Sequence, residues 1–315
     1  MEIKNIRKRG HIVKKLIFVV FLFTQAAYSN AAANTGADFL KIGVGARSAG
    51  LGNAFTAIAN DATAINWNAG GLSQVKQKEV VAMHSQWIAD TNLDYIGFGV
   101  PVRNAVIGAS LVCLSQSGLE GRDANGAQTD DFGASDLAVT FSYSRQVKLN
   151  ANKVGLGINM KMLRQQIASD QAYGVAFDMG ALYYTKSMPL SFGLSLQNIG
   201  TQMKFIDEAY NLPLSVTAGV GYNVGYVTIG LDVKQELYEN KTTISMGTEF
   251  TPINTLAIRA GYLMNQAIST GNTADTLNGL GAGLGINLLG MKTDYSFVPY
   301  GALGNTHKIS FSSKF

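Results

Sequence analysis

Few side chains in this sequence could carry out chemistry. Its single cysteine, Cys113, lies in the apolar run from Leu111 to Leu114, with no histidine or aspartate close to it in sequence. One thiol cannot form an internal disulfide, and a nucleophilic thiol needs a neighbouring base. No Ser-His-Asp set or carboxylate dyad stands out elsewhere. We therefore expect Cys113 to be inert and the protein not to be an enzyme.

The histidines and the glycine-rich stretch predict no metal and no cofactor. His84 and His307 lie beyond the first thirty-three residues, but the pattern around them gives no face on which both lie with further ligands. Two Gly-x-Gly pairs within residues 43–52 are similar to a dinucleotide-binding loop. The third glycine and the preceding buried strand are missing, so nucleotide binding is not expected.

Charged residues on the polar faces of alternating segments could instead line a wet lumen. Asp232 with Lys234, and Lys292 with Asp294, are same-face neighbours that we expect to pair or to stay hydrated. Structural networks inside a lumen are the favoured interpretation, and a selective permeation path is the alternative. The predicted lumen-facing charges are Lys161, Asp178, Asp232, Lys234, Arg259, Lys292 and Asp294.

The segments that carry these charges alternate with a period of two. Between Val154 and Met162, aliphatic residues and methionines occupy one face, and glycine, asparagine and lysine occupy the other. Successive side chains of a strand point to opposite faces, so each such segment is a strand with one apolar face. The pattern recurs at 214–223, 227–234, 256–262 and 308–315.

Such strands could form a soluble sandwich or a membrane barrel. Many segments are close to ten residues long, as a tilted membrane strand requires, whereas sandwich strands average about six. Tyrosines near segment ends suit aromatic girdles, and a charged opposite face suits a wet lumen. We predict an all-β transmembrane antiparallel β-barrel of about fourteen strands over residues 77–315, in contact with outer-membrane lipid. The terminal Phe315 is its candidate insertion signal.

Residues 1–33 are predicted to be a secretory signal peptide, cleaved between residues 29 and 33. A basic stretch ending at Lys15 precedes an apolar run over 16–23 and then small residues, which is the order found in signal peptides. That run is too short to span about 30 Å of hydrocarbon. Residues 1–15 carry a net charge of +5, whereas the whole chain carries +4, so the remainder has a net charge of −1. A nearly neutral remainder predicts no nucleic-acid surface.

Residues 34–76 are rich in small residues and do not alternate. Leu51, Phe55 and Ile58 fall at helical spacing. We expect a small helical hatch packed inside the barrel, with the alternating glycines of 279–285 leaving room for it. The candidate hatch motif comprises Gly43, Gly45, Arg47, Gly50, Gly52, Phe55, Asp61, Asn66, Trp67 and Asn68.

Three stretches, Phe39–Ala57, Phe132–Val139 and Leu196–Gly200, resemble the PorV/PorQ family of outer-membrane proteins. The resemblance covers nearly the whole mature chain. It implies a fourteen-strand barrel with an N-terminal hatch, as in the similar long-chain fatty-acid transporters. It also implies a role in or around the type IX secretion system of Bacteroidetes, where the PorV branch binds the C-terminal signal domains of cargo at the large translocon barrel.

Three functions are therefore considered. The first is a non-enzymatic component of type IX secretion that engages the translocon or the C-terminal domains of cargo. The alternative is a transporter that admits a hydrophobic small molecule past the hatch. An enzyme carried on a barrel ranks last. An adaptor needs an apolar patch on its loops and a shut lumen, whereas a transporter needs an apolar cavity and a movable hatch. The inward charges favour the adaptor.

Overall fold

The computed structural model describes residues 34–123, 125–149, 152–265 and 279–315. The predicted signal peptide, residues 1–33, lies outside them. The described residues form a closed antiparallel barrel of fourteen strands, in which each strand pairs with its neighbours in sequence and β1 pairs with β16. This confirms the predicted barrel and its number of strands. The strands are β1 (Glu79–Gln86), β2 (Asn92–Val102), β3 (Ala105–Leu119), β4 (Phe132–Leu149), β5 (Asn152–Ile167), β6 (Asp170–Tyr184), β7 (Leu190–Gly200), β10 (Ser215–Val224), β11 (Val227–Glu236), β12 (Lys241–Ile253), β13 (Leu256–Asn265), β14 (Leu280–Leu288), β15 (Met291–Pro299) and β16 (Asn305–Lys314).

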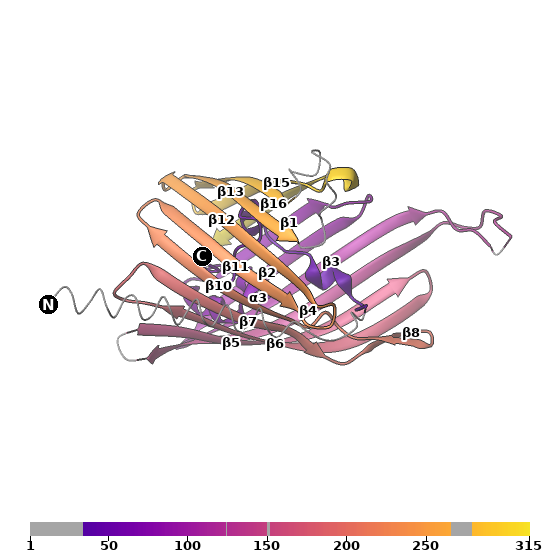
Figure 1. The fold of residues 1–315 in the computed structure, drawn as a ribbon, viewed down its shortest axis with the longest axis horizontal. Helices are drawn as coiled ribbons and strands as arrows, with labels where there is room; N and C mark the ends of the chain where they lie inside the picture. The colour runs from indigo at the N-terminus through magenta and orange to yellow at the C-terminus, as the bar shows by residue number, and fades with distance from the viewer. Residues whose placement is uncertain (1–33, 124, 150–151, 266–278) are drawn as a thin grey trace. The chain divides into compact units, whose positions relative to one another are not determined.

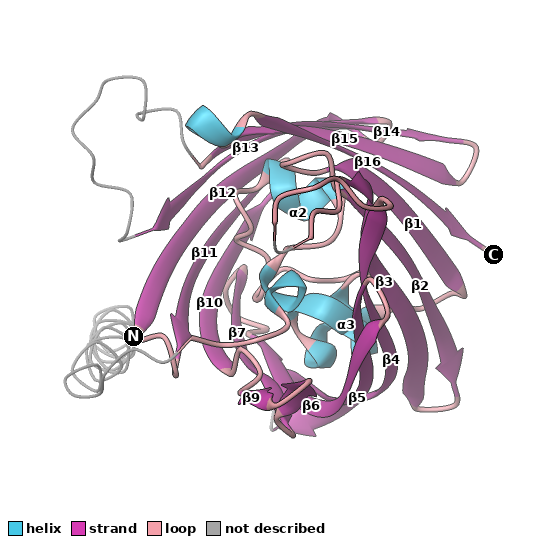
Figure 2. Cartoon of the chain, turned by 90° about the vertical axis from the view of Figure 1, so that its right-hand side faces the viewer, coloured by secondary structure: helices cyan, strands magenta, loops and turns pink. Residues whose placement is uncertain are grey.

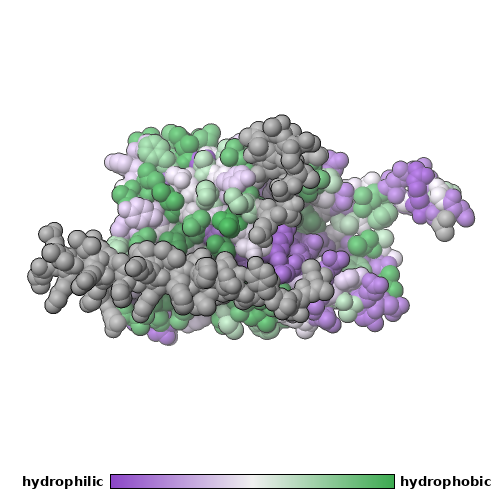
Figure 3. Space-filling view, in the orientation of Figure 1, coloured by the Kyte–Doolittle hydropathy of each residue, from purple (hydrophilic) through white to green (hydrophobic). Residues whose placement is uncertain are grey.

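The barrel presents its apolar faces outward. On β5, Ile158 is 57% exposed, whereas the neighbouring Asn159 is 2% exposed and points inward. The same inversion repeats around the barrel, so that leucine, isoleucine, methionine and aromatic side chains are exposed on its outer faces. Figure 3 shows hydrophobic patches, mixed with polar ones, on one face of the molecule. A soluble barrel would bury these side chains, because burial is what stabilises them. No helix within the described ranges is long and apolar enough to cross a bilayer.

The two ends of the barrel differ. At one end, which we call the turn side, short turns such as 103–104, 254–255 and 289–290 join the strands. At the other, the loop side, most connections are longer, although residues 168–169 alone join β5 to β6. There β3 and β4 project beyond the other strands (Figure 1), and the tip of this projection is hydrophilic (Figure 3). A small hairpin of β8 (Met203–Phe205) and β9 (Glu208–Tyr210) also lies between β7 and β10 on this side.

Residues 34–76, which we call the hatch, pass through the inside of the ring of strands (Figure 2). The helices of the hatch are short: η1 (Asp38–Lys41), α2 (Ala46–Gly50), α3 (Ala64–Trp67) and η2 (Ala69–Gln74). Outside the hatch, a 3-10 turn, η4 (Gly301–Leu303), precedes β16. Asn68 caps η2, because its Oδ1 accepts a hydrogen bond of 3.0 Å from the amide of Gly70.

Glycines on the inner faces of the strands let the hatch backbone approach the barrel wall. A β-carbon added at Gly157 would lie 2.2 Å from the carbonyl oxygen of Ala69 in η2. One added at Gly261 would lie 2.0 Å from the carbonyl carbon of Leu51. In the predicted glycine stretch, Gly281 likewise lies against Ala49. Backbone therefore packs on backbone, and only glycine leaves enough room.

We expect Gly157→Ala to lower the free energy of unfolding by about 1–3 kcal/mol, the usual cost of over-packing. Its new methyl group would meet fixed backbone rather than a side chain that can move. Urea unfolding of the detergent-solubilised protein, followed by heat-modifiable gel mobility, measures the change. Gly99→Ala is the matched control, since its β-carbon would meet only side-chain atoms, Leu72 Cδ1 at 3.3 Å and the two methyl groups of Val75 at 3.4 and 3.7 Å. Equal losses for both variants would contradict the backbone-packing account.

Candidate functional site

Two cavities that share no lining residue lie on either side of the hatch, within the described residues. The loop-side cavity has a volume of about 480 Å³. The turn-side cavity has a volume of about 520 Å³ and is bordered by turns such as 254–255. Each is large enough for a small organic molecule.

One wall of the loop-side cavity is apolar and aromatic. It combines hatch residues with residues from the loop-side connections. Trp87 and Tyr300 pack edge to face, with ring centroids 5.1 Å apart. Burial raises the pKa of Tyr300 to about 12, so its phenol is neutral at physiological pH. The apolar wall comprises Phe39, Leu40, Ile42, Val44, Trp67, Trp87, Ile88, Leu263 and Tyr300.

The rest of the lining is mostly polar. It includes inward side chains of β10, β11 and β12 and charged residues of the hatch and β5: Thr217, Asp232, Lys234, Glu236, Lys241, Thr243, Ser245, Asp38, Lys41 and Lys161. Lys234 Nζ lies 3.3 Å from Glu236 Oε1. A cavity with both an apolar and a hydrogen-bonding lining suits a ligand with an apolar body and a small polar end.

Asp232 anchors the hatch. Its Oδ2 accepts hydrogen bonds from the amides of Phe55, at 2.8 Å, and Thr56, at 2.7 Å, and the residue is only 4% exposed. The expected pairing of Asp232 with Lys234 is wrong, because Asp232 accepts from the hatch amides and Lys234 pairs with Glu236 instead. Lys292 Nζ does lie 3.2 Å from Asp294 Oδ2.

A second buried network holds α3 against β5, β6 and β7. Lys161 Nζ lies 2.9 Å from Asp178 Oδ2 and donates to Asn198 Oδ1 at 2.7 Å. Asn198 has a φ of 63° and sits in the bulge that shifts the register between β6 and β7. Asn159 then donates to the carbonyl of Ile65 at 2.7 Å. Lys161 and Asp178 thus belong to a buried structural network, and Lys161 also lines the loop-side cavity.

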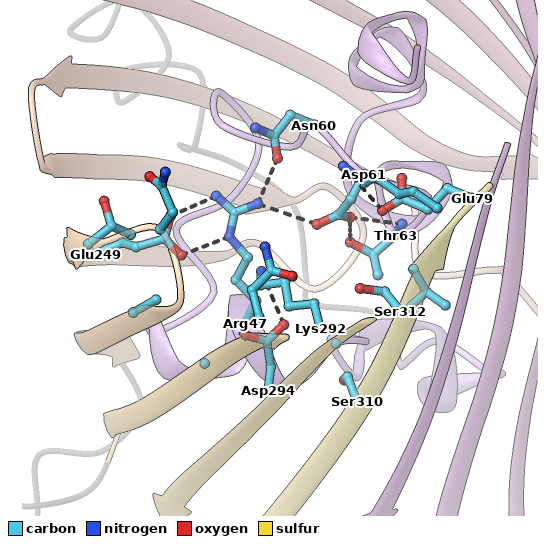
Figure 4. Close-up of a pocket in the computed structure, with 18 of the residues that line it drawn as sticks. Arg47, Asn60, Asp61, Thr63, Glu79, Glu249, Lys292, Asp294, Ser310 and Ser312 are labelled. Atoms are coloured by element: carbon cyan, nitrogen blue, oxygen red, sulfur yellow. Dashed lines mark hydrogen bonds and ion pairs between the residues drawn. The ribbon is translucent and has the colours of Figure 1, made fainter. Parts of the chain in front are cut away.

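On the turn side, Arg47 joins the hatch to the wall (Figure 4). Its guanidinium donates twice to Glu249 of β12, with Nε–Oε2 at 2.9 Å and Nη2–Oε1 at 2.8 Å. It also donates to Asn60 at 2.6 Å and to Asp61 at 3.3 Å. Such a bidentate contact is the strongest arrangement of an arginine and a carboxylate.

The network continues into β13 and β15 through Arg259, whose side chain is fully buried. Arg259 Nε donates to Glu249 Oε2 at 2.6 Å, and its Nη1 lies 2.8 Å from Asp294 Oδ1. Two arginines therefore share Glu249, while Asp294 completes the charge balance. We call Arg47, Glu249, Arg259 and Asp294 the latch.

The predicted hatch motif lies within the hatch and shapes it. Trp67 donates from its indole to the carbonyl of Val44 at 3.0 Å, and its ring lies against Gly43. The Phe55 ring packs on Trp67, and the Arg47 guanidinium lies 5.2 Å from its centroid. Gly45 (φ 94°) and Gly52 (φ 60°) occupy turns, and Gly50 lies against Gly283. Asp61 accepts a hydrogen bond from the amide of Thr63, and the carbonyl of Asn66 accepts one from Gln197. Asn68 caps η2.

His84 and His307 both face outward near the seam of the barrel, each with its own partner. His84 Nδ1 lies 2.7 Å from Asp94 Oδ1, and His307 Nδ1 lies 2.8 Å from the hydroxyl of Tyr295. Among the described residues, no three potential metal ligands cluster. Phe315 is 69% exposed, and its amide donates to the carbonyl of Lys78 at 2.9 Å.

Sequence reasoning missed Glu249, although it lies on the polar face of an alternating strand, which was the available signal. It also missed Lys41 and Glu239, which tie the hatch to the β11–β12 turn, with Thr35 donating to the same carboxylate. Trp87 and Tyr300 lie in connections, where no periodicity marks them as cavity residues.

Removing the Asp232 carboxylate should loosen the hatch. Asp232→Ala leaves the buried amides of Phe55 and Thr56 without a partner, and each such loss costs about 1–3 kcal/mol. Limited proteolysis of the folded barrel should then cut within residues 50–60, which should resist in the native protein. Asp207→Ala is the control, since that side chain is 94% exposed and its lysine contact is 4.0 Å. Continued protease resistance in Asp232→Ala would count against the anchor.

The Lys41–Glu239 contact predicts how docking of residues 34–42 depends on pH. Burial alone would raise the pKa of Glu239, but hydrogen bonds from Lys41 and Thr35 lower it below its ordinary value. Burial alone would lower the pKa of Lys41, but Asp38 and Glu239 raise it above its ordinary value. Stability from Glu239 is present above the ordinary pKa of about 4.3 and lost as pH falls through the folded value. Stability from Lys41 is present below its ordinary pKa of about 10.4 and is lost as pH rises through its raised folded-state pKa.

Hydrogen exchange of residues 34–42, corrected for intrinsic rates, should therefore be most protected between about pH 4.3 and 10.4. Glu239→Gln should remove the loss of protection of residues 34–42 at acidic pH while leaving the barrel strands protected. An unchanged loss of protection at acidic pH in this variant would show that another group docks the segment.

Comparison with known proteins relates the chain to a family and to a group of solved folds. Residues 23–314 match the model of the family described as "Uncharacterised protein family (UPF0164)". A UPF0164 protein of Treponema pallidum (strain Nichols) is 26% identical over 260 residues, which cover 72% of this chain and 61% of that protein. This chain thus matches less than two thirds of that relative's length.

The fold is similar to several solved channels. The CymD monoaromatic hydrocarbon channel superposes with a TM-score of 0.61, at 11% identity over 87% of this chain and 98% of that one. The Ralstonia pickettii toluene transporter TbuX gives 0.58, at 13% identity over 87% and 98%. A Pseudomonas aeruginosa FadL homologue gives 0.55, at 11% identity over 85% and 98%. At these identities the likeness concerns the fold alone. The PorV/PorQ resemblance is not confirmed, and the family model establishes that the chain belongs to the UPF0164 family.

Proposed function

We propose that the protein is an outer-membrane channel that admits small apolar molecules through its loop-side cavity. The observation that carries this proposal is the cavity itself. Aromatic and aliphatic side chains of the hatch and of the loop-side connections form one wall of a space of about 480 Å³. The fold shared with a toluene transporter and a hydrocarbon channel supports the same function.

The outer surface supports a place in a lipid bilayer. Leucine, isoleucine, methionine and aromatic side chains are exposed on the outer faces of strands around the barrel. Such a surface is stable in lipid, whereas in water it would promote aggregation. Barrel closure also pairs the strand edges, which a hydrocarbon environment requires.

The type IX secretion role, with its translocon and cargo partners, stays a prediction. A lumen filled by the hatch suits an adaptor. However, the described part of the β3–β4 tip carries exposed Glu120, Arg122, Asp123, Asp130 and Asp131, rather than the apolar patch that an adaptor for folded cargo needs. The aromatic cavity therefore favours the transport alternative.

The protein's own tryptophans provide a direct test of ligand entry. Trp67 and Trp87 are the only two in the chain, and both line the loop-side cavity. We expect bromobenzene, an apolar heavy-atom quencher, to quench their fluorescence saturably, and toluene to compete with it. Iodide, a charged quencher, should have little effect.

A cavity-filling variant separates entry into the cavity from partition into the detergent. Ser245→Met projects into the loop-side cavity and should abolish the saturable phase. Ser312→Met, which fills the turn-side cavity, is the matched control and should keep it. Linear, non-saturable quenching in the native protein, or identical behaviour of both variants, would refute ligand binding in this cavity.

A further inference from the structure

The two cavities adjoin the same two strands. On β12, Ser245 lines the loop-side cavity and Glu249 the turn-side cavity; on β13, Leu263 and Arg259 do the same. Between them each strand has one inward position at the height of the hatch, and both positions are glycine. Gly247 and Gly261 face each other directly across the β12–β13 pair. No other strand lines both cavities in the described structure.

The part of the hatch that lies on this glycine pair is the Leu51–Gly52 turn. A β-carbon at Gly247 would lie 2.3 Å from the carbonyl oxygen of Leu51, and one at Gly261 would lie 2.1 Å from the amide nitrogen of Gly52. Gly52 has a φ of 60° and makes the turn possible. On this side, therefore, a single turn of hatch backbone separates one cavity from the other.

This turn is held differently from the rest of the hatch. Residues 55–68 bond directly to the wall through Asp232, Asn159, Gln197 and Ser191. Over residues 48–54, in contrast, all the hydrogen bonds within the described structure stay inside the hatch. Polar ties to the wall next to this stretch are the Arg47–Glu249 pair and the Ala46 amide, which donates to Ser310 Oγ at 2.8 Å.

We propose that ligand passes from the loop-side to the turn-side cavity along the inner faces of β12 and β13, and that the Leu51–Gly52 turn is the gate. The latch holds this gate shut. When Arg47 and Glu249 separate, residues 46–54 can lift from the glycine pair while residues 55–68 stay bonded to β5, β7 and β11. The physiological use of this route rests on the proposed channel function, but the gate itself does not.

The polar lining of the turn-side cavity is compatible with such a passage. Its charges pair with one another, so that a passing molecule does not meet an isolated charge. The Arg47 guanidinium already faces an aromatic ring, that of Phe55. A planar cation presented in this way attracts aromatic faces.

The gate can be tested first without any ligand, in planar lipid bilayers. Glu249→Ala removes the carboxylate that both arginines share, and we expect it to produce ion-conductance steps that the native protein lacks. Lys314→Ala is the matched control: it lines the same cavity but only approaches Glu79, at 3.8 Å, and should remain silent. Heat-modifiable gel mobility confirms that each variant is a folded barrel. Silence of a folded Glu249→Ala barrel, or equal conductance in the control, would overturn the gate.

A reducible tether then tests the route. Ala46→Cys with Ser310→Cys, in a Cys113→Ser background, should link the start of α2 to β16. Toluene uptake is measured in cells that carry the protein in their outer membrane. We expect the oxidised tether to reduce uptake to the level of cells without the protein, and a reductant to restore it.

The outcomes separate the two proposals. Uptake that persists through the oxidised tether means that ligand leaves by another path, and it overturns the route while the channel function stands. Absence of uptake by the native protein, together with conductance in Glu249→Ala, removes the channel function but keeps the gate.

Discussion

This structure depends on how closely the hatch backbone can approach the barrel wall. A fourteen-strand barrel encloses more space than its own inward side chains fill. Here a segment of mostly short turns fills part of that space, and it fits because glycines such as Gly157 and Gly261 leave the wall bare where the hatch touches it. Side chains at those positions would push the hatch away, and the anchors that bind it would no longer reach.

The second requirement is that the hatch's polar backbone groups find partners. Short helices and turns leave many amides and carbonyls unpaired, and burying them without partners is costly. The wall supplies the missing groups: Asp232 accepts from two hatch amides, and Asn159 donates to a hatch carbonyl. These inward polar residues would destabilise an ordinary core. Here they form hydrogen bonds with the backbone groups of the hatch that lack partners within the hatch itself.

These two constraints distribute the empty space. Hatch and wall are in close backbone contact along β5 and β6 and again at the Gly247–Gly261 pair of β12 and β13, and a cavity lies on each side of that pair. The loop-side cavity owes its aromatic character to Trp87 and Tyr300, which come from connections, and to Phe39 and Trp67 of the hatch. The turn-side cavity owes its charge to the latch. A single lumen is thereby divided into an aromatic chamber and a polar one, with one turn of backbone between them on that side.

The sequence by itself determined the barrel, its strand number, its outward apolar face and the segment that became the hatch. Those features follow from period-two alternation and from its absence, which are local properties that each segment carries alone. Tertiary structure decided which charges meet. Asp232 lies two residues from Lys234 on one face, yet it bonds to an amide 177 residues away in the chain. Glu249 becomes the centre of the latch only because β12 and the hatch are brought together. The path of a plug through a closed barrel depends on the whole ring of strands, and no local pattern encodes it.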